Sequence, residues 1–313
     1  MKVSVVIPTY FRAHDLSELF DSILKQTVKP FEVIVVDDTP NDSVKKVCDK
    51  FREIFRRFGI DLIYIRNPRE RSSAIARNVG AERARGDIIM FFDSDIILMP
   101  NYIEEILKVF KEKKDAVGVQ GWIVPTWLVR LKKEWIISKH KKYLLIRYLL
   151  DQLMRRFFML GTMYTVYTKD ECKLGSYPII LTKVINCERL SGSNMAFRRE
   201  IFNRFRFDEN LKGYAYMEDT LLTYSVFKEF PRGLYMTPYA KCIHKRSIEG
   251  KKLNEEWRAH LDWCRKYVLM KLFGWKGTII YYWQTIGVKL YELRAKLGPN
   301  ILGRHRKNSS IHV

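Results

Sequence analysis

Two pairs of carboxylates follow directly after apolar runs in the first third of this 313-residue chain. Asp37 and Asp38 come after one such run, and Asp93 and Asp95 come after another. Two carboxylates at positions i and i+2 can hold a hard divalent cation, which bridges diphosphate oxygens and neutralises a leaving group. Because acidic turns are also common, this spacing alone does not decide between a cation site and a turn.

The elements that must position these acids follow from the hydrophobic pattern. Apolar runs alternate with helical periodicity over residues 1 to about 100, which predicts an α/β fold with a mostly parallel sheet. The expected strands are residues 3–7, 32–36, 62–65, 87–92 and 116–124. The expected helices are residues 43–58, closed by Gly59, residues 72–85 and 101–113, and a first helix over 15–24 with Asp15 as its N-cap.

Ligands of an open parallel sheet bind beyond the carboxyl ends of the strands. Polar residues stand at the ends of three of the expected strands, namely Pro8-Thr9-Tyr10, Asp37-Asp38 and Asp93-Ser94-Asp95. The sequence therefore predicts that these three groups converge on one edge of the sheet.

The overall charge and the cysteines bound the class of protein. Lys and Arg number 56 against 35 Asp and Glu, a net charge of +21, which predicts an anionic partner. The five cysteines are scattered and never spaced C-x-x-C, so neither a disulfide framework nor a zinc site is expected. We expect a reducing, cytoplasmic setting without a signal peptide or a membrane-spanning segment.

Two later segments are basic and aromatic. Residues 127–160 read as an amphipathic insertion, and residues 251–313 read as a helical C-terminal appendage whose end, 303–313, frays. Such helices suit an acidic membrane surface, although nucleic acid or ordinary packing on the core would also fit. We expect peripheral association with the inner face of the cell membrane.

A set of motifs in a fixed order identifies a family resemblance. The segments that carry it are residues 3–10, 33–38, 76–80, 91–95, 191–198 and 216–222, with His244 following. Together they resemble a family 2 glycosyltransferase with the GT-A fold. The resemblance covers about residues 1–250, which divide into a nucleotide-binding half (1–100), an insertion and acceptor region (127–190) and an acceptor and catalytic-base half (190–250).

The resemblance implies a role for each matching residue. A nucleotide-diphosphate sugar, expected to be a UDP-sugar, would be bound by Pro8, Thr9, Tyr10, Arg12, Asp38, Arg77, Asp93 and Ser94. A divalent cation, Mn²⁺ or Mg²⁺, would be held by Asp95, Asp93 and His244. Asp219, beside Glu218, would be the general base, and Gly192, Ser193 and Asn194 would lie on the acceptor side.

Several of these residues have simpler interpretations. Glu218 and Asp219 could be an acidic first helical turn, and His244 could be a packing residue. Arg77 could be an ordinary helix-face cation, Gly80 a close-packing glycine, and Asp37 a cap for local backbone amides.

The family contains more than one reaction. The Glu218-Asp219 pair favours a hydroxyl acceptor on a saccharide or polyprenyl-linked glycan over the phosphate acceptor of a polyprenyl-phosphate glycosyl synthase. The absence of Gln-x-x-Arg-Trp favours a single addition over processive synthesis. A nucleotidyltransferase normally has a glycine-rich loop after its first strand, which this chain lacks. A non-enzymatic binder of nucleic acid or another polyanion would leave the converging acids unexplained.

Overall fold

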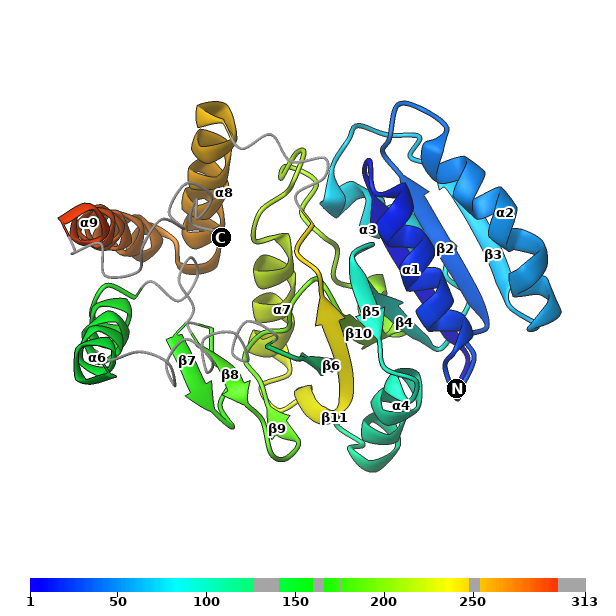
Figure 1. Cartoon of the computed structure of the whole chain (residues 1–313), viewed down its shortest axis with the longest axis horizontal. Helices are drawn as coiled ribbons and strands as arrows, with labels where there is room; N and C mark the ends of the chain where they lie inside the picture. Colours follow the sequence, from blue (N-terminus) through cyan, green and yellow to red (C-terminus); the bar gives the residue numbers. More distant parts are fainter. Residues whose placement is uncertain (126–140, 160–165, 175, 248–253, 298–313) are drawn as a thin grey trace.

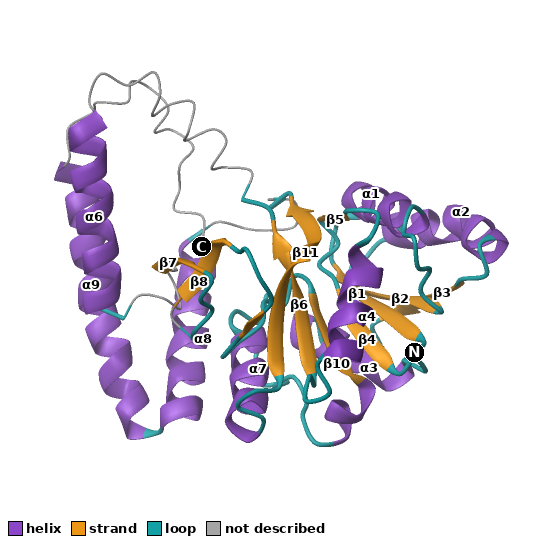
Figure 2. Ribbon diagram, turned by 90° about the horizontal axis from the view of Figure 1, so that it is seen from below, coloured by secondary structure: helices purple, strands orange, loops and turns teal. Residues whose placement is uncertain are grey.

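The computed structural model describes residues 1–125, 141–159, 166–174, 176–247 and 254–297. A mixed sheet with helices on both faces forms the body of the molecule, and three further helices stand at one side of it (Figures 1 and 2). The predicted α/β class with a mostly parallel sheet is confirmed.

The first hundred residues build the parallel half. Its strands are β1 (Val3–Thr9), β2 (Glu32–Asp37), β3 (Asp61–Arg66), β4 (Ile88–Phe91) and the short β5 (Ile96–Leu98), and its helices are α1 (Ala13–Leu24), α2 (Ser43–Arg57) and α3 (Ser73–Arg83). Strands β3, β2, β1 and β4 are adjacent in that order and all parallel. Gly59 has φ +72° directly after the last turn of α2, as the expected C′ residue requires.

The remaining elements complete the sheet and add the flanking helices. They are α4 (Tyr102–Glu112), β6 (Gly118–Ile123), α6 (Lys141–Phe157), β7 (Val166–Lys169), β8 (Ser176–Ile180), β9 (Ile185–Asn186), β10 (Met195–Arg198), the 3₁₀ helix η2 (Arg199–Asn203), α7 (Glu218–Glu229), β11 (Leu234–His244), α8 (Glu255–Phe273) and α9 (Trp275–Leu297). The sheet continues from β4 through antiparallel β10 to β6, β11 and β5.

Two cores lie on the two faces of this sheet. Strand residues alternate between them: Val5 packs with the side of α1, α2 and α4, and Val6 packs with the side of α3, α7 and α8. The strands are apolar on both faces because both faces are covered.

Gly80 sets the distance between α3 and β1. A Cβ atom at this position would lie 2.2 Å from Cγ1 of Val6, so only glycine lets the helix approach the strand this closely. The close-packing interpretation of Gly80 is therefore confirmed.

The start of the first helix was predicted wrongly. Helix α1 begins at Ala13, with Arg12 at the N-cap and no side-chain cap, so Asp15 lies inside the first turn. Asp15 and Glu18 both accept an ion pair from Lys245, which follows β11. A long-range partner thus explains the acidic spacing that resembled a capping box.

The basic aromatic segments are helical where they are described. Helix α6 belongs to the predicted insertion and contacts α9 of the appendage through a small cluster of Met154, Phe158, Val288 and Tyr291. Residues 126–140, 160–165 and 298–313, which hold the rest of the insertion and the predicted frayed end, lie outside the described residues. Among the described helices none is long and apolar enough to cross a bilayer.

Substituting Gly80 tests the close packing of α3 on β1. We expect Gly80→Ala to lower the free energy of unfolding by about 1–3 kcal/mol, because the added methyl group overpacks a closed core. Arg83→Ala, on the exposed end of the same helix, should change it by less than about 0.5 kcal/mol. Urea titration followed by circular dichroism measures both, and a Gly80→Ala variant as stable as the wild type would contradict the packing argument.

Candidate active site

The carboxyl ends of β1, β2 and β3 meet at one edge, where the polar residues after β1 and β2 were predicted to converge. Thr9 is opposite Asp37 in the parallel register, and Asp38 donates its backbone N–H to the Thr9 carbonyl at 3.0 Å. Asn67, after β3, donates its backbone N–H to the Asp37 carbonyl at 2.9 Å.

The two neighbouring acids after β2 have different environments. Asp37 is fully buried and accepts hydrogen bonds from the Thr39 backbone and the Tyr64 hydroxyl, both at 2.8 Å, so it caps local groups. Asp38 accepts from the Asn67 amide at 2.7 Å. Burial raises the pKa of Asp38 to about 6, and the hydrogen bond from Asn67 opposes the rise.

The residues after β1 form the other wall of this edge. The guanidinium of Arg71 lies 4.3 Å over the Tyr10 ring and hydrogen-bonds the Tyr10 hydroxyl at 2.9 Å. Pro8 is half-buried in β1. Thr9 is buried, and its hydroxyl has no hydrogen-bond partner among the described residues.

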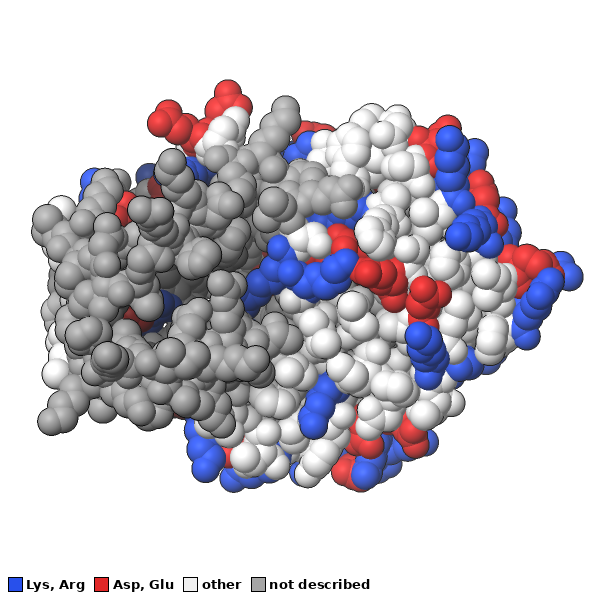
Figure 3. All heavy atoms as spheres, viewed as in Figure 1, with Lys and Arg blue, Asp and Glu red and all other residues white. Residues whose placement is uncertain are grey.

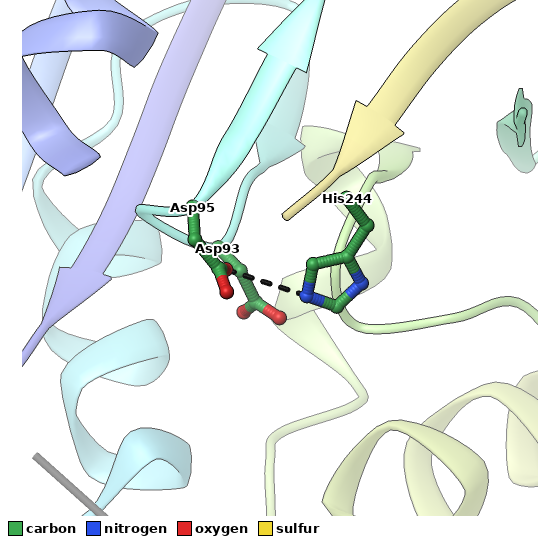
Figure 4. A group of neighbouring side chains, drawn as sticks. All are labelled: Asp93, Asp95 and His244. Carbon is green, nitrogen blue, oxygen red and sulfur yellow. Dashed lines mark ion pairs between the residues drawn. The ribbon is translucent and has the colours of Figure 1, made fainter. Parts of the chain in front are cut away.

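His244 comes together with Asp93 and Asp95, although it is distant from them in the sequence. Each offers one ligand atom, and these atoms lie within 4.8 Å of one another (Figure 4). The two acids connect β4 to β5, and His244 ends β11 opposite Ile96 of β5. The antiparallel pairing of β5 with β11 therefore brings the histidine to the acids.

Asp95 is completely enclosed by positive and polar partners. One carboxylate oxygen lies 2.9 Å from Nη1 of Arg12 and 3.3 Å from Nε2 of His244, and the other accepts the Ser247 N–H at 2.9 Å. Burial by itself raises the pKa of Asp95, but the hydrogen bond from His244 and the charges around it lower the pKa below its ordinary value. Asp95 is thus ionised, as a metal ligand must be.

The donor set of this cluster suits a divalent cation. Two carboxylates and one imidazole match the ligands that Mn²⁺ accepts, and carboxylates also suit Mg²⁺. Asp93 retains 31% of its side-chain surface, so it remains accessible from the open edge. The residues therefore fit the cation that the motifs implied.

Arg77 connects this cluster to the opposite side of the site. Its guanidinium lies 2.8 Å from Asp93 and 2.6 Å from Glu218, and it donates to the Gly192 carbonyl at 3.3 Å. The side chain is almost fully buried. Arg77 is thus directed at protein carboxylates, whereas the family resemblance placed it facing the base or the phosphates.

The adjacent acids Glu218 and Asp219 begin helix α7 and point to different partners. Burial raises the pKa of Glu218 to about 8, while the charge of Arg77 acts against this rise. Asp219 is half-buried and accepts backbone N–H groups from Gly192 at 2.7 Å and Thr220 at 2.6 Å. Both carboxylates are therefore oriented by the fold, and Asp219 is the more accessible.

The three predicted acceptor-side residues separate into two groups. Gly192 approaches Asp219 so closely that an added Cβ would lie 3.0 Å from the Asp219 Cβ, and the Ser193 carbonyl accepts the Asp93 N–H at 3.1 Å. Asn194 is buried and donates to the Gly121 carbonyl of β6 at 3.0 Å. Gly192 and Ser193 border the site, whereas Asn194 holds the strands beneath it.

The prediction from the sequence missed some residues of this edge and gave others a different position. Ser94 is buried between the two acids, and Arg12 contacts Asp95. Asn67, Arg71 and Ser247 were not singled out. The strand-end rule that identified Asp37 and Asp38 would also have identified Asn67, which follows β3.

Comparison with known proteins gives this geometry a context. The family described as "Glycosyl transferase family 2" matches residues 4–206. The chain is 35% identical over 132 residues to a glucosyl-dolichyl phosphate glucuronosyltransferase of Haloferax volcanii, covering 42% of this chain and 41% of that protein. It is 34% identical over 133 residues to a dolichol-phosphate mannosyltransferase of Pyrococcus furiosus, covering 41% and 36%. The chain therefore spans about two fifths of the length of these curated relatives.

Solved structures share the fold. The mannosyltransferase PcManGT from Pyrobaculum calidifontis, in complex with GDP-Man and Mn²⁺, superposes with a TM-score of 0.57 at 16% identity, covering 95% of this chain and 76% of that one. Residues 1–349 of S. aureus TarS give a TM-score of 0.53 at 17% identity, covering 94% and 73%. The predicted GT-A fold is confirmed.

The raised pKa of Glu218 predicts a pH-dependent stability. The folded chain binds a proton at Glu218 that the unfolded chain releases above its ordinary pKa, so the free energy of unfolding falls as pH rises from about 5 to about 8. Glu218→Gln should reduce this fall by an amount of the order of a few kcal/mol. Unfolding titrations across this pH range measure the slope, with Glu53→Gln on the exposed face of α2 as the control. Equal slopes in the wild type and Glu218→Gln would contradict the assignment.

Proposed function

Because the chain belongs to glycosyl transferase family 2, we propose that it is an inverting, non-processive enzyme. It transfers a sugar from a nucleotide-diphosphate sugar, which we propose is a UDP-sugar, to a hydroxyl of a saccharide or polyprenyl-linked glycan. The observation that carries this proposal is the chain of contacts from the Asp93–Asp95–His244 cluster through Arg77 and Gly192 to Asp219. It joins a group of cation ligands to an accessible carboxylate across one site.

The proposed role of each site residue follows from its burial and its hydrogen-bond partners. Asp38, Thr9 and Tyr10 form the edge that would hold the nucleoside, and the buried Thr9 hydroxyl, which has no partner in the described part of the chain, has hydrogen-bonding capacity to spare. Asp93, with Asp95 and His244, would hold Mn²⁺ or Mg²⁺, which supplies positive charge to the departing diphosphate. Arg77 and Glu218 position Asp93 and the Gly192 turn.

Asp219 is the proposed general base. The N–H groups of Gly192 and Thr220 fix its carboxylate without covering it, since the residue is half-buried. In an inverting transfer this carboxylate takes the proton of the acceptor hydroxyl while the anomeric carbon is attacked from the face opposite the nucleotide.

A polyprenyl-phosphate acceptor is the alternative within the family, and the name of the dolichol-phosphate mannosyltransferase makes it worth testing. A phosphate is already a nucleophile and needs no base. The two reactions therefore differ in how strongly they depend on Asp219.

A non-enzymatic polyanion binder is less well supported. On the face drawn in Figure 3, basic and acidic side chains alternate around α1 and α2 instead of forming one basic field. On α2, Arg52 and Arg56 pair with Asp49 and Glu53.

Two substitutions separate donor binding from transfer. We expect Asp95→Ala to abolish Mn²⁺-dependent thermal stabilisation by the nucleotide sugar, because the substitution removes a buried carboxylate that would bind the cation. Asp219→Asn should keep that stabilisation but slow transfer to a hydroxyl acceptor by about 10²- to 10⁴-fold. A screen of nucleotide sugars with and without metal, followed by product detection, measures both effects.

Asp49→Ala is the matched control, because it removes an exposed carboxylate from α2. It should behave as the wild type in both assays. Full transfer by Asp219→Asn to a polyprenyl phosphate would favour the phosphate acceptor, and wild-type behaviour of both site variants would refute the mechanism.

We also propose that the enzyme works as a peripheral protein at the inner, cytoplasmic face of the cell membrane. Helix α6 exposes Ile146, Leu149, Leu150, Leu153 and Phe157, and α9 exposes Trp275, Ile279, Tyr282, Ile286, Leu290 and Leu293. These positions recur at helical spacing. Arg156 on α6 and Lys276 and Lys289 on α9 add positive charge, as helices that lie on acidic lipid require.

Liposome flotation tests this placement. We expect the wild type to float with vesicles containing acidic phospholipid, and less so at high salt. Leu153→Glu combined with Ile286→Glu should prevent flotation, since charge replaces two exposed apolar side chains, whereas Ile54→Glu on α2 should not. Failure of the wild type to bind any vesicle would contradict the proposal.

A further inference from the structure

Two of the five cysteines lie side by side. Cys172 follows β7 and Cys187 follows β9, and the two residues form an isolated parallel bridge between their segments. The Glu188 N–H donates to the Cys172 carbonyl at 3.0 Å within this bridge. Both side chains are buried, with 3% and 1% of their surface exposed.

The bridge geometry suits a covalent bond. Neighbouring extended segments lie about 4.8 Å apart, which is within the range of Cα separations found in disulfides. Bridged residues direct their side chains to the same face. Hydrogen bonding from the neighbouring Cys187 thiol lowers the pKa of Cys172 against the effect of burial, and Cys172 Sγ donates to the Arg189 carbonyl at 3.5 Å.

The other thiols have different neighbours. Cys242 lies 3.2 Å from the Asn194 amide, and Cys264 lies 3.5 Å from His260. Cys48 is buried in the core between α2 and the sheet. All five thiols are buried, so the bridged pair is distinguished from the rest by its position.

We propose that Cys172 and Cys187 are a disulfide-forming pair. The oxidant is a small-molecule disulfide of the glutathione type. The Cys172 thiolate attacks one of its sulfurs, forming a mixed disulfide and releasing one thiol. Cys187 then loses its proton and attacks Cys172, which forms the protein disulfide and releases the second thiol. Two protein thiols are oxidised and one small disulfide is reduced to two thiols.

The bond would act on the acceptor side of the site. Residues 188–191 lead directly from Cys187 to Gly192, which donates its N–H to Asp219. Hydrogen bonds already hold the segment in place, among them those from the Leu174 N–H to Glu188 at 2.9 Å and from the Ser191 N–H to Gln120 at 2.6 Å. A Cys172–Cys187 disulfide adds a covalent tie between the β7–β8 unit and this segment. The inference does not depend on the proposed reaction.

Refolding in glutathione buffers tests the pair without relying on access to buried thiols. The full chain is unfolded in urea, refolded at a series of oxidised-to-reduced glutathione ratios, alkylated and mapped by mass spectrometry. We expect loss of two alkylation sites and of about 2 Da, with the bond mapped to Cys172 and Cys187. Cys48→Ser should retain it. Cys172→Ser and Cys187→Ser should give only a mixed disulfide with glutathione.

Thermal unfolding then shows whether the bond fits the folded chain. Oxidation should raise the Tm of the wild type and of Cys48→Ser, and should not raise that of Cys172→Ser. Five alkylatable thiols at every glutathione ratio would overturn the proposal, as would a bond mapped to another pair. An oxidised protein that melts below the reduced one would also overturn it, because the bond would then distort the fold.

Discussion

The rest of the site depends on the burial of one positive charge. The Arg77 guanidinium on α3 is removed from water, so it is stable there only with anionic or hydrogen-bonding partners close by. Asp93 and Glu218 supply them at 2.8 and 2.6 Å, and the Gly192 carbonyl supplies a third contact. These partners come from both halves of the chain. Displacing the second half against the first would separate the buried guanidinium from Glu218 and Gly192, so Arg77 helps to fix the distance between the two sides of the site.

The topology of the sheet explains why the partners meet there. Parallel β1, β2 and β4 deliver their polar ends to one edge, while antiparallel β10 is inserted between β4 and β6. The turn before β10 therefore lies beside Asp93, which donates its backbone N–H to the Ser193 carbonyl. At the far end of the sheet, β5 and β11 pair and bring His244 beside Asp95. Local hydrophobic patterns determine where the strands form, but it is the pairing of the strands that brings the candidate cation ligands together.

This distinction sets what the sequence could predict. The ends of β1, β2 and β4 were predictable because strand periodicity is local and parallel strands share one edge. The pairing of Asp15 with Lys245 and of Cys172 with Cys187 was not, because both depend on contacts between segments whose separation the local pattern does not encode. Asn194 shows the same limit: the family resemblance assigns it to the acceptor side, yet its amide donates to the Gly121 carbonyl of β6. Residue roles for catalysis and donor binding remain predictions.

The environment of Asp95 resolves an apparent conflict over Arg12. The family resemblance assigns Arg12 to the donor, but in the structure it contacts an oxygen of Asp95 that also faces His244. A divalent cation at this cluster would compete with Arg12 for the same oxygen of Asp95. Because the Arg12–Asp95 ion pair would then be lost, the cation would bind more weakly unless Arg12 found another anion. The diphosphate of a donor is such an anion. We therefore expect the cation and the donor to bind cooperatively. The cation releases Arg12 from Asp95, and the diphosphate then gives Arg12 a new anionic partner.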